Sequence, residues 1–390
     1  MLSHFFADMH IHIGRDMHGQ PVKITASNQL TLTNILKEAS RRKGIDMIGV
    51  IDCQSPAVQE EIYHLLVTER AVELADGGIR FENVTLLMGA EIEVYDEKCQ
   101  GPLHVLCFLP TLQAMNTFTT WLTSRMKNVT LSSQRYYGTA IDLQNKVSEL
   151  SGLFIPAHVF TPFKSVYGKG VKQSLQEVFD PHLIDGIELG LSSDTNMADQ
   201  IKELHPYTYL TNSDSHSLQK IAREYQKIQM KEPSFKEFHR ALHQMDGRKI
   251  VANYGMNPLL GKYFTTVCQK CMNPVPFQTK QCPTCQSKRI INGVYDRIKQ
   301  LKSTNGKKEN RPPYYYQVPL DYLPGLGAKT FEKLLAHFDT EMNVIHQISF
   351  EQLATIIPTK LATLIIEMRK GNLEIKAGGG GKYGRVVTRS

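Results

Sequence analysis

Short apolar runs alternate with amphipathic stretches over the first 215 residues, and this alternation limits the fold more than any other feature of the chain. Each run has the length of one buried strand, and the stretches between them, such as LTNILKEASRRKG, show the spacing of helices. Strands that alternate with helices in this way predict a parallel α/β sheet or an α/β barrel. The expected strands span residues 5–13, 46–52, 85–95, 102–109, 153–159, 184–190 and 207–214.

Residues that commonly bind metal ions recur at the C-terminal ends of these strands. The first strand contains ADMHIHI, and because side chains at i and i+2 share one face of a strand, Asp8, His10 and His12 point the same way. In barrels of parallel strands the chemistry gathers at this end. A solvated loop would explain one or two such positions but not the whole series. The strand-terminal residues of this kind are His10, His12, Asp52, Glu91, Glu93, His158, Asp214 and His216, and His104 lies within the strand 102–109.

Histidines and carboxylates that converge in this way can hold two or three divalent ions. Such ions clamp a phosphate, lower the pKa of a bridging water and stabilise the leaving oxygen. Imidazole ligands favour Zn²⁺ or Mn²⁺, whereas a purely carboxylate set would favour Mg²⁺. The pattern predicts phosphoester hydrolysis with water as the nucleophile, and either Asp214 or Glu91 could bridge two ions. No Ser/His/Asp or Cys/His arrangement suggests a covalent mechanism.

The two parts of the chain carry opposite charge. Residues 1–219 hold 17 Lys and Arg against 25 Asp and Glu, whereas residues 220–390 hold 28 against 13, within a total of +7. An acidic, histidine-rich part joined to a basic part indicates a metal centre coupled to a polyanion-binding surface, and nucleic acid is the expected polyanion. Because no apolar run is long enough to span a bilayer, we expect a soluble cytoplasmic protein without a membrane partner, associated with the nucleoid when it acts.

Four of the seven cysteines follow the pattern C-x2-C-x10-C-x2-C. Each CxxC turn presents two thiolates, and two such turns complete a closed tetrahedral Zn²⁺ site. Because sulfur fills all four positions, one structural zinc ion is predicted, and two pairs at this spacing argue against a redox role. Nearby Lys270, Lys280, Lys288 and Arg289 suit contact with phosphate. The ligands are Cys268, Cys271, Cys282 and Cys285.

The segment LPGLGAKTFEKLLAHF, at 323–338, is similar to a helix-hairpin-helix element. In such an element glycines allow a tight turn, and backbone N–H groups of the turn bind a DNA phosphate without reading bases. An ordinary joint between two helices is the alternative, but the surrounding basic residues favour DNA. The residues of the pattern are Pro324, Gly325, Gly327 and Lys329.

A second candidate nucleic-acid segment, TPFKSVYGKGVKQSLQ, follows His158 directly. Its rings can stack on a base, and its glycines let backbone amides approach the edge of that base. A loop that only closes the mouth of the barrel is the alternative. The candidate contacts are Phe163, Lys164, Ser165, Tyr167, Gly168, Lys169 and Lys172.

These features divide the chain into five expected parts. The barrel is followed by a connector with the pattern of basic helices, the cysteine module, a polar linker, and a helical DNA-binding region with a glycine-rich tail. Their expected bounds are 1–220, 221–262, 263–300, 301–318 and 319–390.

Several of these motifs together resemble the PHP superfamily of metallophosphoesterases. They are HIH in the first strand, an acidic residue after the second, GAE in the third, later histidines, and SDSH near the last. The resemblance implies a distorted (βα)7 barrel with a trinuclear metal centre. Asp16 is an alternative to His18, and Cys53 departs from the family, which often has histidine there. The implied ligands are His10, His12, His18, Glu91, His104, His158, Asp214 and His216, with Asp214, Glu91 and His158 assigned to catalysis.

Over essentially its whole length the chain resembles the endonuclease Q family of DNA-repair nucleases. The resemblance includes the TPFKSVYG loop and the GGGGKYGRV tail. It implies cleavage of the phosphodiester bond 5′ to uracil, hypoxanthine, xanthine or an abasic site in double- or single-stranded DNA. The lesion base would flip into a pocket, with the segment after His158 as its wall. A sliding clamp is a possible further partner, although the sequence holds no clear docking peptide.

Two other functions are considered. A PHP-type phosphatase of a small phosphate monoester would use the same metal centre, but such a substrate needs no basic surface like that of residues 220–390. A DNA-binding scaffold with a vestigial barrel would explain Cys53 but not the retention of nearly every ligand. Metal-dependent cleavage of lesion-containing DNA distinguishes the first function from both alternatives.

Overall fold

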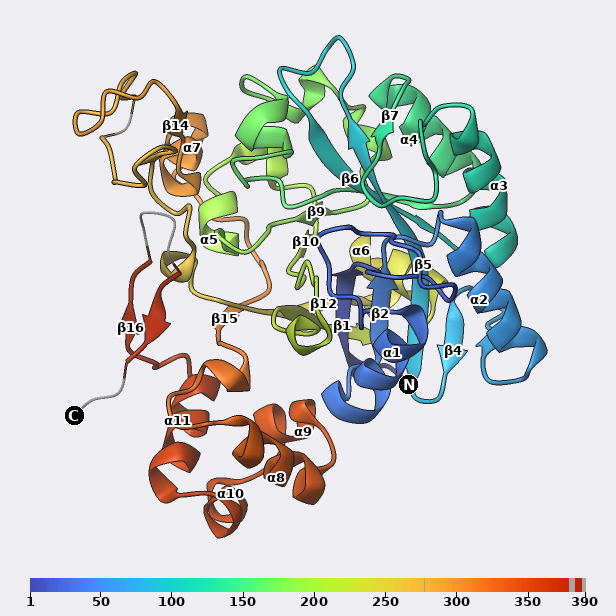
Figure 1. The fold of residues 1–390 in the computed structure, drawn as a ribbon, viewed down its shortest axis with the longest axis vertical. Coiled ribbons are helices and arrows are strands. Elements are labelled where there is room, and N and C mark those ends of the chain that lie inside the picture. Colours follow the sequence, from blue (N-terminus) through green and yellow to red (C-terminus); the bar gives the residue numbers. More distant parts are fainter. Residues whose placement is uncertain (277, 379–382, 388–390) are drawn as a thin grey trace.

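The computed structural model describes residues 1–276, 278–378 and 383–387. A barrel built from the N-terminal residues forms the largest part of the molecule (Figure 1). The cysteine module and its helix α7 lie on one side of the barrel, and four short helices, α8 to α11, form a separate layer below.

The main sheet is mixed. Its strands follow the order β15-β12-β11-β1-β2-β5-β4-β3, while β6 pairs with β5 and β8, and β7 pairs with β5. Strands β1, β2 and β5 are parallel, whereas β6 runs antiparallel to both neighbours. The bounds are β1 (Ser3–Ile11), β2 (Met47–Val50), β3 (Val72–Glu73), β4 (Ile79–Phe81), β5 (Val84–Val94), β6 (Leu103–Leu109), β7 (Arg135–Tyr136), β8 (Leu153–Pro156), β11 (Tyr225–Met230), β12 (Lys249–Gly255) and β15 (Tyr314–Tyr316).

Two further strands close the barrel. Strand β9 (Ile187–Glu188) lies parallel to β10 (Tyr209–Leu210), and it connects to the end of β8 where Val159 N–H donates to the Glu188 carbonyl at 2.9 Å. Beyond β10, Ser215 forms a parallel bridge with Ile11 at the end of β1. The ring is therefore β1-β2-β5-β6-β8-β9-β10, closed back on β1.

Helices cover the outside of this ring and build the C-terminal region. Several begin with a capping hydroxyl, as at Thr111, whose Oγ1 accepts the N–H of Ala114 at the start of α3. The bounds are α1 (Leu32–Lys37), α2 (Pro56–Val67), α3 (Leu112–Thr123), α4 (Ala140–Glu149), α5 (Thr195–Ala198), α6 (Phe235–Leu242), α7 (Val294–Leu301), α8 (Ala328–Phe338), α9 (Glu341–His346), α10 (Phe350–Ile356) and α11 (Thr359–Arg369).

The interior of the barrel is a packed apolar core. The Phe108 ring lies so close to the backbones of Gly49 and Gly89 that an added Cβ at either glycine would come within 3 Å of it. At the far end of the strands, Phe238 of α6 and Ile228 of β11 join the same core. Helix α6 thus plugs one end of the barrel and leaves the other end for chemistry.

All seven barrel strands expected from the sequence are present, most of them shorter than predicted. The expectation of a parallel sheet was wrong for β6, which follows β5 after an eight-residue connection that is too short for a helical crossover. The α/β class and the distorted seven-stranded barrel are confirmed.

Two segments differ from their predicted secondary structure. The connector at 221–262 was expected to be helical, but only α6 is an α-helix, while β11 and β12 extend the sheet beyond β1. The high content of Lys and Gln in this segment led to the helical prediction, although Ile228 and Met230 of β11 are buried. Within the predicted linker at 301–318, Tyr314–Tyr316 forms β15 beside β12. The remaining domain bounds stay predictions.

The C-terminal helices are fixed to the barrel by polar contacts. Lys43 donates to the carboxylate of Glu341 at 2.5 Å, and both side chains are buried. Arg42 makes a second, exposed ion pair with Glu332 on α8. Small hairpins form from β13 (Val267–Cys268) with β14 (Ile290–Ile291) and from β16 (Ile375–Lys376) with β17 (Arg385–Val386).

Within the described residues, no helix combines the length and the apolar character needed to cross a bilayer. Part of the predicted glycine-rich tail, residues 379–382 and 388–390, lies outside the described residues.

His346 is a largely buried imidazole at the contact between the C-terminal helices and the barrel. Its ring stacks on Phe6 with a centroid distance of 4.4 Å, and the Tyr225 hydroxyl lies 2.6 Å from its Nε2. Burial, together with Lys227 and Arg369, lowers the pKa of His346 to about 3.

We therefore expect acid to weaken this contact. The unfolded imidazole takes up a proton below pH 6.5 while the folded one stays neutral down to about pH 3, so stability present above pH 6.5 is lost across this window. Between pH 7 and pH 5 the loss is about 2 kcal/mol. Urea unfolding of the natural chain and of His346→Phe at both pH values measures it. Equal pH dependence in the two proteins would contradict the assignment.

Candidate metal centre

Ligand-type side chains from separate strands meet at the open end of the barrel. His10 and His12 come from the end of β1, and Asp214 comes from the segment that closes the ring onto it. The Asp214 Oδ1 atom lies 3.4 Å from His10 Nε2 and 3.5 Å from His12 Nε2. Two imidazoles and one carboxylate oxygen therefore face a common point.

Glu91 on β5 is the centre of the second half of the cluster. Its Oε1 lies 2.8 Å from His104 Nδ1 and 3.3 Å from His158 Nε2. The same carboxylate approaches the first half, with His10 Nε2 3.6 Å from Oε1 and His12 Nε2 3.7 Å from Oε2. Glu91 thus lies between the two groups. We call the seven residues the catalytic cluster, after the role that the sequence predicts for them: His10, His12, Glu91, His104, His158, Asp214 and His216.

Two members of the catalytic cluster hold strained backbone conformations. His158 has φ of 30° and Asp214 has φ of 45°, which side chains with a Cβ rarely adopt. Each lies just after its strand, where the chain turns across the mouth of the barrel. Such strain is typical of sites where the surrounding structure fixes a functional side chain.

The chemistry of these residues fits divalent cations. Within the described part of the chain, the Nε2 atoms of His10, His12 and His104 are buried yet have no hydrogen-bond partner. A buried polar atom without a partner costs free energy, and a metal ion between His10, His12 and Asp214 would satisfy the first two. The Nε2 atom of His104 instead lies on the side of Glu93, 3.8 Å from its Oε2. The set His10, His12, Asp214 and the set Glu91, His104, His158 could each hold one ion.

Other carboxylates orient the histidines from behind. Glu188 on β9 accepts from His10 Nδ1 at 2.9 Å, and Asp52 lies 3.1 Å from His12 Nδ1. Each contact leaves Nε2 directed at the cluster, as is usual for histidines that bind metals. Glu188 also accepts from Asn212 and from the backbone N–H of His158, so it joins three strands of the ring.

The two central carboxylates are ionised. Burial alone would raise the pKa of Glu91, but His104 and Lys23 hold it well below its ordinary value. Burial acts in the same direction on Asp214, and His10 and His12 overcome it and lower the pKa of Asp214. Negative charge is therefore held where a cation would bind.

Lys23 and Ser133 are functional candidates that the sequence did not indicate. Lys23 Nζ lies 3.3 Å from Glu91 Oε2 and 2.6 Å from Ser133 Oγ, which also donates to Glu91. Both residues lie in loops without a recognisable motif, so no sequence signal marks them. Glu188 was also missed, although its place at the end of a predicted strand is a signal.

A cavity of about 280 Å³ opens above the catalytic cluster. Its outer wall combines three segments that are distant in the sequence: Phe163 from the loop after β8, Tyr263 ahead of the cysteine module, and Tyr383 from the tail. The rings of Phe163 and Tyr263 meet edge to face at 5.4 Å, and Lys262 Nζ lies 5.5 Å from the Tyr383 ring. The wall is therefore aromatic and basic.

Three residues considered near the centre lie apart from it. His18 was expected among the ligands, but its half-exposed ring contacts Glu60 on α2. Asp16 accepts the backbone N–H groups of His18 and Gln20 instead of facing the cluster. Cys53 is fully buried, its Sγ lies 3.2 Å from the Val50 carbonyl, and burial raises the pKa of its thiol. Cys53 is thus a core residue and not a thiolate ligand.

Part of the segment after His158 serves the fold and not the cavity. Tyr167 is buried, stacks on Phe160 and contacts Glu203, so it is not free to stack on a base as predicted. Ser165 is buried and accepts the N–H of Gly168, where a Cβ would collide with the Thr161 carbonyl. Phe163 and Lys164 line the cavity, whereas Lys169 and Lys172 are exposed outside it.

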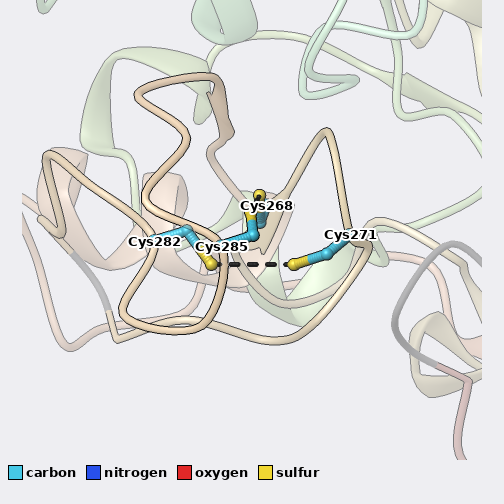
Figure 2. A group of neighbouring side chains, drawn as sticks. All are labelled: Cys268, Cys271, Cys282 and Cys285. Carbon is cyan, nitrogen blue, oxygen red and sulfur yellow. Dashed lines mark hydrogen bonds between the residues drawn. The ribbon is translucent and has the colours of Figure 1, made fainter.

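The four module cysteines converge from two loops (Figure 2). The Sγ atoms of Cys268 and Cys285 are 3.5 Å apart, and those of Cys271 and Cys282 are 3.6 Å apart. A tetrahedral zinc ion with bonds of about 2.3 Å separates its sulfurs by about 3.8 Å, so the geometry fits. Backbone N–H groups of Cys271 and Lys270 lower the pKa of Cys268, which favours the thiolate that zinc requires.

The PGLG turn lies on the surface between the barrel and the C-terminal helices. Pro324, Gly325, Gly327 and Lys329 are all exposed, and Gly325 has φ of +91°, which permits the turn. Helix α8 begins directly afterwards at Ala328. Backbone N–H groups at such a start are available to an anion.

No protein-family model matches the chain. Uncharacterized protein YqxK of Bacillus subtilis (strain 168) is 52% identical over 381 residues, which cover 98% of this chain and 98% of that protein. Uncharacterized protein MJ0043 of Methanocaldococcus jannaschii is 34% identical over 254 residues, which cover 58% of this chain and 31% of that protein.

Two solved structures are similar over nearly the full length. The lesion-specific endonuclease PfuEndoQ from Pyrococcus furiosus matches with a TM-score of 0.84 and 30% identity, covering 98% of this chain and 95% of that chain. Endonuclease Q in complex with a 27-mer duplex, which has an abasic lesion at the active site, matches with the same TM-score and identity over 98% and 96%.

Proposed function

Because this chain belongs to the endonuclease Q family, we propose that it is a metal-dependent DNA-repair endonuclease that cleaves the phosphodiester bond 5′ to a damaged nucleotide. The damaged nucleotides are those with deaminated bases (uracil, hypoxanthine and xanthine) and abasic sites. The related endonuclease Q binds a duplex with an abasic lesion at its active site, which supports the last of these.

One observation carries the proposal. Two buried imidazole nitrogens without partners, Nε2 of His10 and Nε2 of His12, face the carboxylates of Asp214 and Glu91 at the base of a cavity. A closed core would not leave such atoms unsatisfied. The arrangement suits two or three Zn²⁺, Mn²⁺ or Mg²⁺ ions and a phosphate above them.

Ions bound there would neutralise phosphate charge and lower the pKa of a water molecule. Within the protein, Glu91 and Asp214 supply the negative charge that holds them, while Glu188 and Asp52 fix the rings of His10 and His12. Lys23 faces the cavity beside Glu91 and is a protein cation placed to contact a phosphate oxygen.

The aromatic wall suits an extruded nucleotide. Phe163 and Tyr383 can stack on a base, and Lys262 adds positive charge for the adjoining phosphate. Extrusion costs least for a mispaired or missing base, which favours lesions over intact DNA. The exposed PGLG turn and the lysines of the cysteine module lie outside the cavity and would contact the duplex backbone.

The test is cleavage of an end-labelled duplex with one deoxyuridine, compared with hypoxanthine, xanthine, abasic and undamaged duplexes. Reactions with Mn²⁺, Mg²⁺ or EDTA are run beside Asp214→Ala, which removes the carboxylate between His10 and His12. We expect a nick one bond 5′ to the lesion that needs metal, is abolished in Asp214→Ala and is absent from undamaged DNA.

Two results would reject the proposal. Hydrolysis of a phosphate monoester without nicking of any lesion duplex would favour a small-molecule phosphatase. Binding of DNA without cleavage of either substrate, at any metal concentration, would indicate a scaffold.

A further inference from the structure

A second group of metal-type side chains lies at the opposite end of the barrel from the catalytic cluster. His239 and His243 are one turn apart at the end of α6, and Asp185 lies just before β9. One ligand atom from each of the three lies within 4.8 Å of the others. Glu188, at the end of β9, contacts His10, so the short segment from Asp185 to Glu188 connects the two groups.

Asp185 is held in place before any ion binds. Its Oδ2 accepts the backbone N–H of Phe154 at 2.7 Å, and its own N–H donates to the Phe154 carbonyl at 3.0 Å. The other oxygen, Oδ1, lies 2.9 Å from His243 Nε2. One carboxylate oxygen therefore faces the helix with its orientation fixed by β8.

The two histidines share one face of α6. Their ring centroids are 4.6 Å apart, as expected for residues at i and i+4 on a helix. A histidine pair at this spacing with a nearby carboxylate is a common ligand set for Zn²⁺.

The separations suit an ion with little movement. Bonds of about 2.1 Å in tetrahedral geometry place neighbouring ligand atoms about 3.4 Å apart. The 2.9 Å contact between Asp185 and His243 would open by a few tenths of an ångström, and His243 is partly exposed and can shift. We propose that Asp185, His239 and His243 form a Zn²⁺ site that fastens α6 to the barrel, with water as the fourth ligand.

This site would stabilise the position of helix α6, which closes one end of the barrel. Phe238, Ala241 and Leu242 of α6 belong to the interior core, whereas His243 at the end of the helix makes a polar contact with Asp185, just before β9. An ion bonded to both would resist withdrawal of α6. The proposal is independent of the reaction at the catalytic cluster.

Anomalous scattering at the zinc edge tests the position directly. Crystals of the full chain soaked in ZnCl₂ should show a peak between the three side chains, beside peaks at the cysteine module and the catalytic cluster. In His239→Ala, which keeps the contact between Asp185 and His243, that peak alone should disappear. Peaks at the other two positions with none at α6 in the natural chain would overturn the proposal.

Thermal unfolding tests it in solution. At a zinc concentration about 100-fold above the dissociation constant, one site raises Tm of a chain this long by about 3 °C. We expect the zinc-dependent rise in Tm to be smaller by this amount in His239→Ala. His182→Ala, which removes an exposed histidine outside the group, is the matched control and should behave as the natural chain. An equal rise in His239→Ala and His182→Ala would overturn the proposal.

Discussion

Glu91→Gln is expected to lower kcat/KM for nicking of uracil-containing duplex by about 10³-fold, or about 4 kcal/mol of transition-state stabilisation. Both Glu91 oxygens contact histidines of the catalytic cluster, and Lys23 is paired with the same carboxylate. Glutamine keeps the shape but removes the charge that would hold cations between the two halves of the cluster. Initial rates over a range of duplex and Mn²⁺ concentrations measure the effect.

The matched control is Glu61→Gln, which makes the same change at a buried glutamate outside the cluster. Glu61 accepts from Thr33, and the glutamine oxygen can still do so. Its kcat/KM should stay within about threefold of the natural value, in keeping with an effect of a few tenths of a kcal/mol. If Glu91→Gln cleaves as fast as Glu61→Gln, Glu91 does not hold the catalytic metal.

Cys282→Ser is expected to remove the structural zinc and unfold the cysteine module. Structural zinc supplies about 10–16 kcal/mol in small modules of this type, far more than the short β13–β14 hairpin can. Elemental analysis should show one zinc fewer per chain, and limited proteolysis should cut within 263–300 while the barrel stays intact. Loss of the ordered surface that carries Lys270, Lys280, Lys288 and Arg289 should weaken binding of the duplex by about tenfold at moderate salt.

Cys99→Ser provides the comparison, because Cys99 is a buried free thiol outside the module. It should keep its zinc content and its protease resistance. A Cys282→Ser protein that retains full zinc and a protected module would contradict a four-cysteine site.

The sequence predicted the barrel strands and the members of the cluster because both depend on local pattern. Alternation of apolar runs with amphipathic stretches located β1, β2, β5, β6, β8, β9 and β10, and ligand-type residues in these strands or just after them located all seven members of the cluster. The antiparallel direction of β6 was also predictable, since only eight residues separate it from β5. Charge predicted secondary structure less well. The lysines of 221–262 favoured a prediction of helices, whereas part of this segment forms β11 and β12.

The remaining errors concern residues whose role is decided by distant partners. His18 has the composition of a ligand, but its loop directs it to Glu60, whereas Lys23 from the same loop reaches Glu91. Tyr167 lies in a segment of nucleic-acid character but packs on Phe160 inside the protein. Tyr263 and Tyr383 join Phe163 only through the tertiary fold, and no spacing in the sequence relates them.

The closure of the barrel has a consequence for its dynamics. The strand ring is sealed where Ser215 exchanges backbone hydrogen bonds with His10 and His12, and Asp214 is the preceding residue. Breaking these hydrogen bonds would pull Asp214 away from the imidazoles of His10 and His12. A cation bound by His10, His12 and Asp214 would therefore stabilise the closed ring. Binding of cations to the cluster should then be measurable by hydrogen exchange in the absence of substrate. Amide hydrogen exchange of His12 and Ser215 would slow when divalent ions are added, while exchange at the β3–β4 hairpin would not.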